Sequence, residues 1–375
     1  MSERYVGAWV TDGGFNPLAS PAPQYTYYLN SWGNNAAGQL GLGNRTYYSS
    51  PKQVGSLTNW LNVATGNYHI VANKTDGTLW SWGSSAQGQL GLGNITYYSS
   101  PKQVGSLTNW SIVKAGYFQS YAIKTDGTLW AWGDNYFGEL GLGNNINYSS
   151  PKQVGSLTNW KNIYGQQYFA VALKTDGTLW SWGRNNYGQL GLNNITYYSS
   201  PKQVGLLTNW SSVSLGLYNT IAIKTDGTLW SWGYNGFGQL GNNTTSNYSS
   251  PKQIGALTTW SNTGSLNFVT AGIKSDGTLW TWGFNNYGQL GLGNRTYYSS
   301  PKQVGLLTNW KTISGGANHA VSVKTDGTLW SWGLNNRGQL GLGNTTFYSS
   351  PKQVGSLTSW LKASCFYTYS TALAY

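Results

Sequence analysis

The chain has 375 residues and a net charge of +12, yet only 9% of its residues are charged, and Gly (51), Tyr (28) and Trp (21) are abundant. So many aromatic residues exclude a disordered chain, and the single cysteine, Cys365, excludes an internal disulfide bond and a cysteine metal cluster. No stretch approaches the ~20 apolar residues of a membrane span, and the first residues lack the apolar segment of a signal peptide. We therefore expect a soluble, folded protein.

Residues 1–24 do not share the pattern of the remaining chain. They contain Trp9, Phe15 and three prolines, at positions 17, 21 and 23. We predict a non-repeat N-terminal arm over 1–24 that is extended rather than folded as a domain. Trp9 and Phe15 are its candidate contact residues.

From residue 25 onward the chain follows a repeat of 50 residues. The segment Lys74–Gly83, Lys-Thr-Asp-Gly-Thr-Leu-Trp-Ser-Trp-Gly, returns with small changes at Lys124, Lys174, Lys224, Lys274 and Lys324. Asp and Gly tolerate the positive φ of a tight turn, and the flanking runs favour strands, so each copy predicts a β-hairpin. With two further runs, each copy is expected to hold four strands, near 60–65, 69–74, 78–83 and 50–54.

Repeated four-stranded units in a ring form a β-propeller. The motif Ser/Ala/Thr-Trp-Gly occurs seven times, at Trp32, Trp82, Trp132, Trp182, Trp232, Trp282 and Trp332. Six full copies span 51–350, and the two chain ends supply complementary halves of one more. The sequence thus predicts an all-β, seven-bladed propeller over 25–375, closed by joining N- and C-terminal strands in one blade. An open solenoid with capping repeats is the alternative, but it has no use for complementary half-copies.

One lysine per copy has no acidic neighbour within the repeat. These lysines supply more than half of the net charge and form a candidate basic ring: Lys52, Lys102, Lys152, Lys202, Lys252, Lys302 and Lys352. Edge protection and solubility are one interpretation of the ring. Attraction to an anionic partner is the other.

Differences between the copies concentrate in the connections from the third to the fourth strand, at 84–87 and its counterparts, and also at 65–68. Alternating strand directions place these connections on one face of the propeller. Tyr, Phe and Arg among Asn residues are typical of contact surfaces, so we identify a candidate binding face: Tyr136, Phe137, Arg184, Tyr187, Tyr234, Phe237, Phe284, Tyr287 and Arg337. Drift of exposed loops is the alternative explanation.

The chain offers little for catalysis. The Gly-Gln-Leu-Gly-Leu-Gly segment at 38–43 recurs with small changes in every copy and indicates tight turns rather than a phosphate loop. His69 and His319 share a repeat position that accepts Phe169 and Val269 as well as Gln, Asn and Tyr in the other copies, which indicates a structural role. Asp134 and Glu139 form a weak candidate acid–base pair. We expect no catalytic residues, no metal and no cofactor.

The repeat Val/Ile-x-x-Gly-x-x-His, followed by Lys-Thr-Asp-Gly-Thr-Leu-Trp-Ser-Trp-Gly and Gly-Gln-Leu-Gly-Leu-Gly, resembles the regulator of chromosome condensation repeat family from residue 25 to 375. The resemblance implies a seven-bladed propeller that binds proteins through its loops. Family functions include nucleotide exchange on a small nuclear GTPase, chromatin docking, light sensing and β-lactamase inhibition. The near-identical copies and the lack of inserted loops are more similar to bacterial or phage members, so exchange activity is not carried over.

The resulting hypothesis is a non-enzymatic binding or structural propeller, in a virion or on a cell surface, for decoration or adhesion. Its expected partners are proteins, such as other virion or surface proteins, with a glycan possible and nucleic acid not expected. The alternative is a cytoplasmic scaffold or small-GTPase regulator. An enzyme acting in the central channel is a third and weaker hypothesis.

Overall fold

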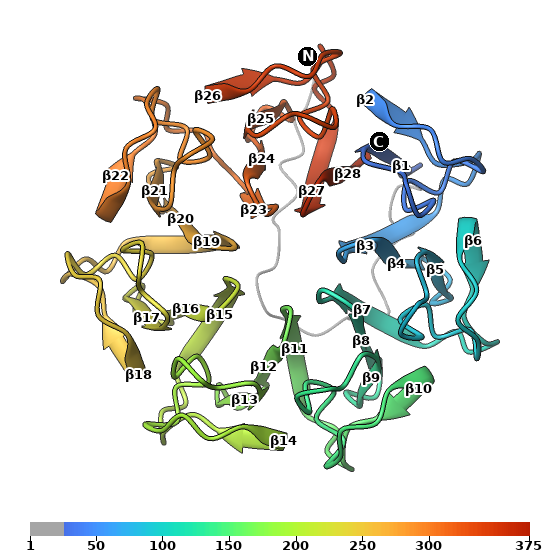
Figure 1. Ribbon diagram of the computed structural model, residues 1–375, viewed down its shortest axis with the longest axis horizontal. Helices are drawn as coiled ribbons and strands as arrows, with labels where there is room; N and C mark the ends of the chain where they lie inside the picture. Colours follow the sequence, from blue (N-terminus) through green and yellow to red (C-terminus); the bar gives the residue numbers. More distant parts are fainter. Residues whose placement is uncertain (1–25) are drawn as a thin grey trace, which may run out of the picture.

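Seven four-stranded antiparallel sheets form a closed ring around a central channel in the computed structural model, which describes residues 26–375 (Figure 1). Each sheet is one blade. Blades 1 to 6 follow the chain from β3–β6 to β23–β26, and blade 7 combines β27, β28, β1 and β2. This arrangement confirms the seven-bladed propeller that the repeat predicts.

Within each blade the chain runs from the channel to the rim (Figure 1). The innermost strands are β3 (Trp60–Thr65), β7 (Trp110–Ala115), β11 (Trp160–Gly165), β15 (Trp210–Leu215), β19 (Trp260–Leu266), β23 (Ser314–Gly315) and β27 (Trp360–Phe366). The second strands are β4 (His69–Lys74), β8 (Gln119–Lys124), β12 (Phe169–Lys174), β16 (Asn219–Lys224), β20 (Val269–Lys274), β24 (His319–Val323) and β28 (Tyr369–Ala374).

The third strands are β5 (Leu79–Gly83), β9 (Leu129–Gly133), β13 (Leu179–Gly183), β17 (Leu229–Gly233), β21 (Leu279–Gly283), β25 (Leu329–Gly333) and β1 (Tyr28–Gly33). The rim strands are β6 (Tyr98–Gln103), β10 (Tyr148–Gln153), β14 (Tyr198–Gln203), β18 (Tyr248–Gln253), β22 (Tyr298–Gln303), β26 (Tyr348–Gln353) and β2 (Tyr48–Gln53). The predicted strand positions hold to within about two residues, except in blade 6. There β23 is only two residues long, because the Thr312 hydroxyl accepts a hydrogen bond from Val323 N and competes with the ladder.

The hairpin turn of each full copy is stabilised by its own side chains. Asp76 Oδ1 accepts hydrogen bonds from the backbone N and the hydroxyl of Thr78, and that hydroxyl accepts one from Trp80 Nε1. Gly77 has φ +77°, and a Cβ there would lie 1.9 Å from the Thr108 carbonyl oxygen, so only glycine fits. The Lys74 ammonium lies 3.8 Å from the centre of the Trp80 ring, a cation–π contact.

A tryptophan on each third strand joins neighbouring blades. The indole N–H of Trp82 donates to the carbonyl of Gln39, which lies in the loop between β1 and β2 of the preceding blade, at 3.1 Å. The same bond recurs at all seven blade boundaries, at 2.8–3.1 Å, from Trp32, Trp82, Trp132, Trp182, Trp232, Trp282 and Trp332. All seven indoles are fully buried. The hydrophobic core therefore lies between the blades and not within them.

The two ends of the chain meet in blade 7. Strand β1 pairs with β28 over six residue pairs, from Tyr28 opposite Ala374 to Gly33 opposite Tyr369. The Tyr369 hydroxyl contacts blade 1 through the carbonyls of Gly66 and His69, at 2.9 and 2.6 Å. The ring is thus closed by joining N- and C-terminal strands, as the half-copies predict.

A buried amide supports the loop between the third and the rim strand in six blades. Gln39 Oε1 accepts a hydrogen bond from Ala37 N at 2.9 Å, and Gln89, Gln189, Gln239, Gln289 and Gln339 repeat this bond. In blade 2 the same position holds Glu139, whose Oε2 accepts from Phe137 N at 2.7 Å. Burial is the largest cause that raises the pKa of Glu139 to about 8. Its carboxyl group is therefore mostly neutral near pH 7.

We predict that Glu139→Gln removes a pH-dependent loss of stability. The carboxyl group has a pKa near 4.5 when unfolded and about 8 when folded, so the folded state binds the proton more tightly. The contribution of this proton binding to the free energy of unfolding is complete below about pH 4.5 and is lost as the pH rises towards 8. The melting temperature of Glu139→Gln should match that of the wild type at pH 5 and exceed it by at least about 2 °C at pH 9.

Thermal unfolding followed by circular dichroism measures this difference, and the reverse change provides the control. Gln189→Glu places the same carboxyl group in blade 3 and should lower the melting temperature at pH 9 more than at pH 5. Parallel pH profiles of the wild type and Glu139→Gln would show that Glu139 does not titrate with folding.

We predict that deletion of residues 351–375 abolishes cooperative folding of the ring. The deletion removes β27, β28 and the second half of β26, so β1 loses its partner strand and blade 6 loses part of its rim strand. Open strand edges and exposed apolar residues favour aggregation. Size-exclusion chromatography and thermal unfolding measure the effect, and a monomeric truncated protein with an unchanged melting temperature would contradict closure by strand pairing.

Candidate binding face

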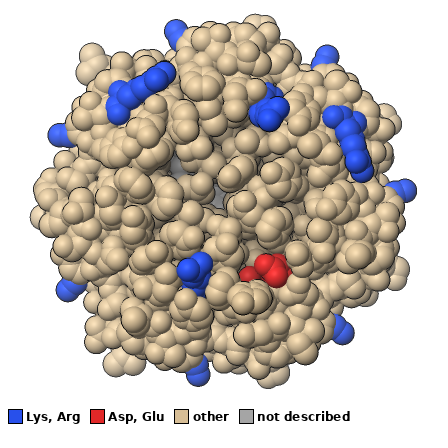
Figure 2. Space-filling view, in the orientation of Figure 1, with Lys and Arg blue, Asp and Glu red and all other residues tan. Residues whose placement is uncertain are grey.

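The loops that differ most between copies lie on one face of the ring. They join the third strand to the rim strand, as β9 to β10, and the first strand to the second, as β11 to β12. The hairpin turns and the links between blades lie on the opposite face, because neighbouring strands in a blade are antiparallel. The variable face is viewed in Figure 2, where basic side chains stand around the perimeter and at isolated places, and most of the surface is uncharged.

A buried asparagine gives most of these loops a fixed shape. Asn185 Nδ2 donates to the carbonyl of Asn194 at 3.0 Å, and Asn185 Oδ1 accepts from Leu190 N at 2.9 Å. Asn35, Asn135, Asn235, Asn285 and Asn335 make corresponding contacts in their own loops. The variable side chains beside these asparagines are therefore carried on loops of nearly the same conformation.

A continuous series of ring contacts crosses blades 2 to 5. Successive ring centroids are 4.8–6.4 Å apart along the path Tyr136, Phe137, Tyr168, Tyr218, Tyr187, Tyr234, Phe268, Phe237, Phe284 and Tyr297. Tyr197 joins it through Phe137 at 5.8 Å. We call these residues, together with Arg184, the aromatic arc. Edge-to-face, tilted and stacked contacts between the rings hold them in defined positions.

Arg184 lies within the aromatic arc. Its guanidinium carbon is 5.0 Å from the Phe137 ring centre, 5.1 Å from that of Tyr168 and 5.4 Å from that of Tyr218. The Nε atom is buried and has no hydrogen-bond partner among the described residues. Three rings thus fix a cation in place on the variable face.

Several rings of the aromatic arc remain accessible. Tyr136 is 71% exposed, Tyr197 43% and Tyr297 39%. The other rings are half-buried by one another and by the loops. The corresponding loops of blades 7 and 1 carry Ala36 and Ala86, so the aromatic surface is one-sided.

Seven of the nine residues predicted for the binding face lie in the aromatic arc: Tyr136, Phe137, Arg184, Tyr187, Tyr234, Phe237 and Phe284. The other two lie outside it. Tyr287 contacts Phe347 at 6.2 Å, and Arg337 lies 5.4 Å from the Tyr47 ring, both towards blades 6 and 7. Whether these residues bind a partner stays a prediction.

Sequence reasoning missed three members of the aromatic arc that come from the first-to-second-strand loops: Tyr168, Tyr218 and Phe268. A signal was present, because residue 68 and its counterparts are aromatic in five copies: Tyr68, Phe118, Tyr168, Tyr218 and Phe268. A further group was also missed. Tyr117 contacts Phe118, Phe366 and Tyr367 at 4.6, 5.9 and 6.0 Å, and so connects blades 2 and 7.

The seven lysines of the candidate basic ring are exposed on the rim strands, and basic side chains are seen around the perimeter in Figure 2. Each ammonium lies 5.4–5.7 Å from the ring centre of the tyrosine four residues earlier. Both interpretations of the ring stay open. The candidate arm contacts, Trp9 and Phe15, lie outside the described residues.

The residues considered as weak catalytic candidates are His69, His319, Asp134 and Glu139, and their contacts stabilise the fold. Burial lowers the pKa of His69 and of His319 to about 3, so both rings are neutral. The Ser120 hydroxyl donates to the Gln89 carbonyl, so His69 Nε2 must donate to Ser120 Oγ, 3.0 Å away. Glu139 replaces the glutamine of the other blades, and burial also raises the pKa of Asp134. These groups hold loops and blades together.

Metal-binding clusters and membrane-spanning helices are both missing from the part of the chain that the structure describes. No cluster of three or more His, Cys, Asp or Glu side chains within residues 26–375 could hold a metal ion. Over the same range, no helix is long and apolar enough to cross a membrane.

Solved structures show the same fold. Human WBSCR16 is 21% identical, with a TM-score of 0.84, over 93% of this chain and 98% of its own. Prp20p from Saccharomyces cerevisiae is 19% identical, with a TM-score of 0.82, over 94% of this chain and 92% of its own. At these identities the similarity is one of fold. No curated protein sequence matches the chain.

Family comparison covers nearly the whole propeller. Residues 27–273 match the RCC1-like domain, and residues 276–323 and 326–373 each match the regulator of chromosome condensation (RCC1) repeat. A second description of the RCC1 repeat matches 310–339. The blade count, the ring closure and these matches agree, and the chain belongs to the RCC1-like domain family.

Proposed function

We propose that this chain is a protein-binding propeller whose partner docks on the variable face, over the aromatic arc of blades 2 to 5. The single observation that carries the proposal is the continuous series of ring contacts that contains Arg184. Aromatic residues and arginine supply most of the binding energy in protein interfaces. Elsewhere on the variable face the described residues form only shorter groups of ring contacts, such as that of Tyr117 with Phe118, Phe366 and Tyr367.

Rigidity of the aromatic arc supports this proposal. Its rings contact one another, and the loops that carry them are held by buried asparagine and glutamine side chains. A surface that is ordered before binding loses little side-chain entropy when the partner docks. A mostly uncharged surface with an occasional arginine fits a partner that presents apolar and amide groups, not a strongly charged one.

Regulation of a small GTPase is a narrower form of the same proposal. Prp20p has binding properties to Gsp1p and to histones, and a second structure shows yeast RCC1 (Prp20) bound to Kap60. Those partners belong to Prp20p, and the shared fold supports testing the same class here. A nucleotide-release assay with small GTPases from the source organism separates exchange activity from plain binding.

The virion or cell-surface setting remains a prediction from the sequence. Mass spectrometry of density-purified particles from the source tests it, since a virion protein must be enriched there. A protein absent from such particles would leave the scaffold or GTPase-regulator alternative. A glycan ligand is likewise a prediction without a described contact that favours it.

We predict that Tyr136→Ala combined with Tyr197→Ala weakens partner binding at least tenfold while the melting temperature stays within about 2 °C. Both rings are exposed, so their removal leaves the core intact, whereas loss of interface aromatics commonly costs more than about 1 kcal/mol each. Affinity for a partner recovered from the source is measured by surface plasmon resonance.

The repeat supplies a matched control. Tyr97 occupies the repeat position of Tyr197, is 42% exposed, and lies in blade 1, outside the aromatic arc. Tyr97→Ala should bind the partner as the wild type does. If Tyr97→Ala weakens binding as much as the double variant does, or if the double variant binds as tightly as the wild type, the partner does not dock on the aromatic arc.

A further inference from the structure

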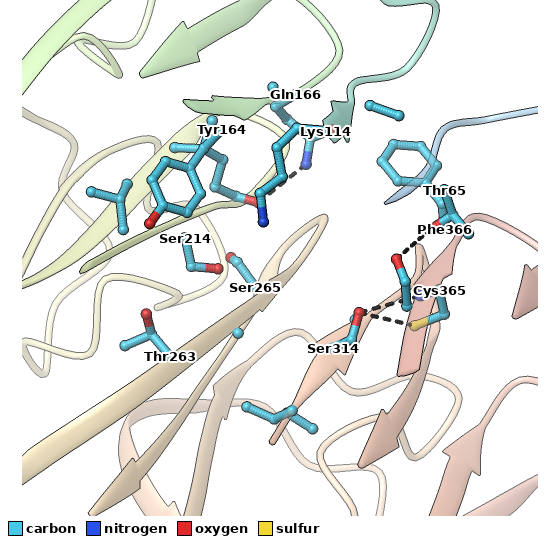
Figure 3. Close-up of a pocket in the computed structure, with 18 residues that line it drawn as sticks. Thr65, Lys114, Tyr164, Gln166, Ser214, Thr263, Ser265, Ser314, Cys365 and Phe366 are labelled. Atoms are coloured by element: carbon cyan, nitrogen blue, oxygen red, sulfur yellow. Dashed lines mark hydrogen bonds between the residues drawn. The ribbon is translucent and has the colours of Figure 1, made fainter. Parts of the chain in front are cut away.

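The central channel contains a cavity of about 230 Å³ that all seven blades line through their innermost strands (Figure 3). Its walls come mainly from one repeat position and from the residues beside it. That position reads Ala64, Lys114, Tyr164, Ser214, Gly264, Ser314 and Ser364 around the ring. Most of these side chains are small or carry a hydroxyl group, so the described wall of the channel is polar here.

Lys114 is the one charged residue among the described residues that line the cavity. Its side chain extends into the space between Tyr164, Ser214 and Ser265 (Figure 3). The ammonium lies 5.6 Å from the Tyr164 ring centre, which offers a weak cation–π contact only. No carboxylate of residues 26–375 lines this cavity.

A second lysine lies near Lys114. Lys362 on β27 is exposed and donates to Asn62 Oδ1 at 2.8 Å. Desolvation and, to a smaller extent, repulsion by Lys114 lower the pKa of Lys362 to about 8. Lys114 is half-buried, and desolvation lowers its pKa as well. An anion beside two lysines that repel each other favours the charged form of both.

Hydroxyl groups that line the cavity together with Lys114 are suited to binding an anion. The Ser214 side chain points into the cavity (Figure 3). Ser314 Oγ accepts a hydrogen bond from Cys365 N at 3.2 Å, so its own proton is available to donate to another acceptor. Oxygen atoms of a small oxyanion can accept several such bonds at once, together with those of an ammonium group.

We propose that the channel cavity binds a small oxyanion of the phosphate class, held by the Lys114 ammonium and by the hydroxyl groups of Ser214 and Ser314. The site is separate from the aromatic arc and does not depend on the proposed protein partner. Inorganic phosphate is the probe, and sulfate tests whether the site distinguishes between tetrahedral oxyanions.

The test is isothermal titration calorimetry of the full chain with phosphate at constant ionic strength. The wild type should bind phosphate saturably at one site. Lys114→Ser should bind at least tenfold more weakly. Serine occupies this repeat position in blades 4, 6 and 7, so the variant should fold, and a melting curve in phosphate-free buffer checks this. Lys114→Gln serves as a second variant if Lys114→Ser is unstable.

An exposed arginine offers a control with the same change of charge. Arg295→Ser removes an exposed cation from the loop between β21 and β22 and should leave phosphate affinity within twofold of the wild type. Phosphoserine as a second ligand distinguishes a free ion from a phosphoryl group on a larger molecule. The proposal is overturned if the wild type shows no saturable binding, if Lys114→Ser binds as tightly, or if Arg295→Ser weakens binding equally.

Discussion

The structure depends on one hydrogen bond made seven times, from a buried tryptophan N–H to a backbone carbonyl of the preceding blade. The indole fills the gap between two sheets, and its N–H would be left unpaired there without the Gln-Leu-Gly turn. Gly41 permits the approach, since a Cβ at that position would lie 2.6 Å from Trp82 Nε1. The pair Trp82 and Gln39, 43 residues apart, therefore fixes the third strand of one blade against a turn of the preceding blade.

This constraint separates the two tasks of the variable loops. Residues such as Asn185 and Gln189 point inward and hold each loop against its blade. The positions between them face outward and are free to differ, as Tyr187 and Ala86 do. A surface for a partner can thus be altered in one blade without disturbing its neighbours, which is why the aromatic arc occupies four blades and ends sharply.

Much of the fold could be predicted from the sequence, because a 50-residue period with Asp-Gly turns and alternating strands leaves few architectures open. The seven-bladed ring, its closure and most strand bounds are confirmed. The short β23 could not be foreseen, since it results from the Thr312 side chain bonding to Val323 N.

The variable face was predicted at the level of loops. The positions of Tyr168, Tyr218 and Phe268 were missed because ring contacts between different loops depend on how the blades are spaced. The channel lysine could not be identified as such, because only the structure brings the seven innermost strands together.

The split blade has a consequence for assembly. Strands β27 and β28 recognise β1 and β2 through the same type of contacts that every other blade uses within itself. Nothing in those contacts distinguishes strands of one molecule from strands of another, so only the short distance between the two ends favours closure within a single chain. When many chains fold close together, β28 of one chain can pair with β1 of another, so that two chains exchange their terminal strands. The local concentration of newly made chains therefore decides whether separate rings or linked rings form.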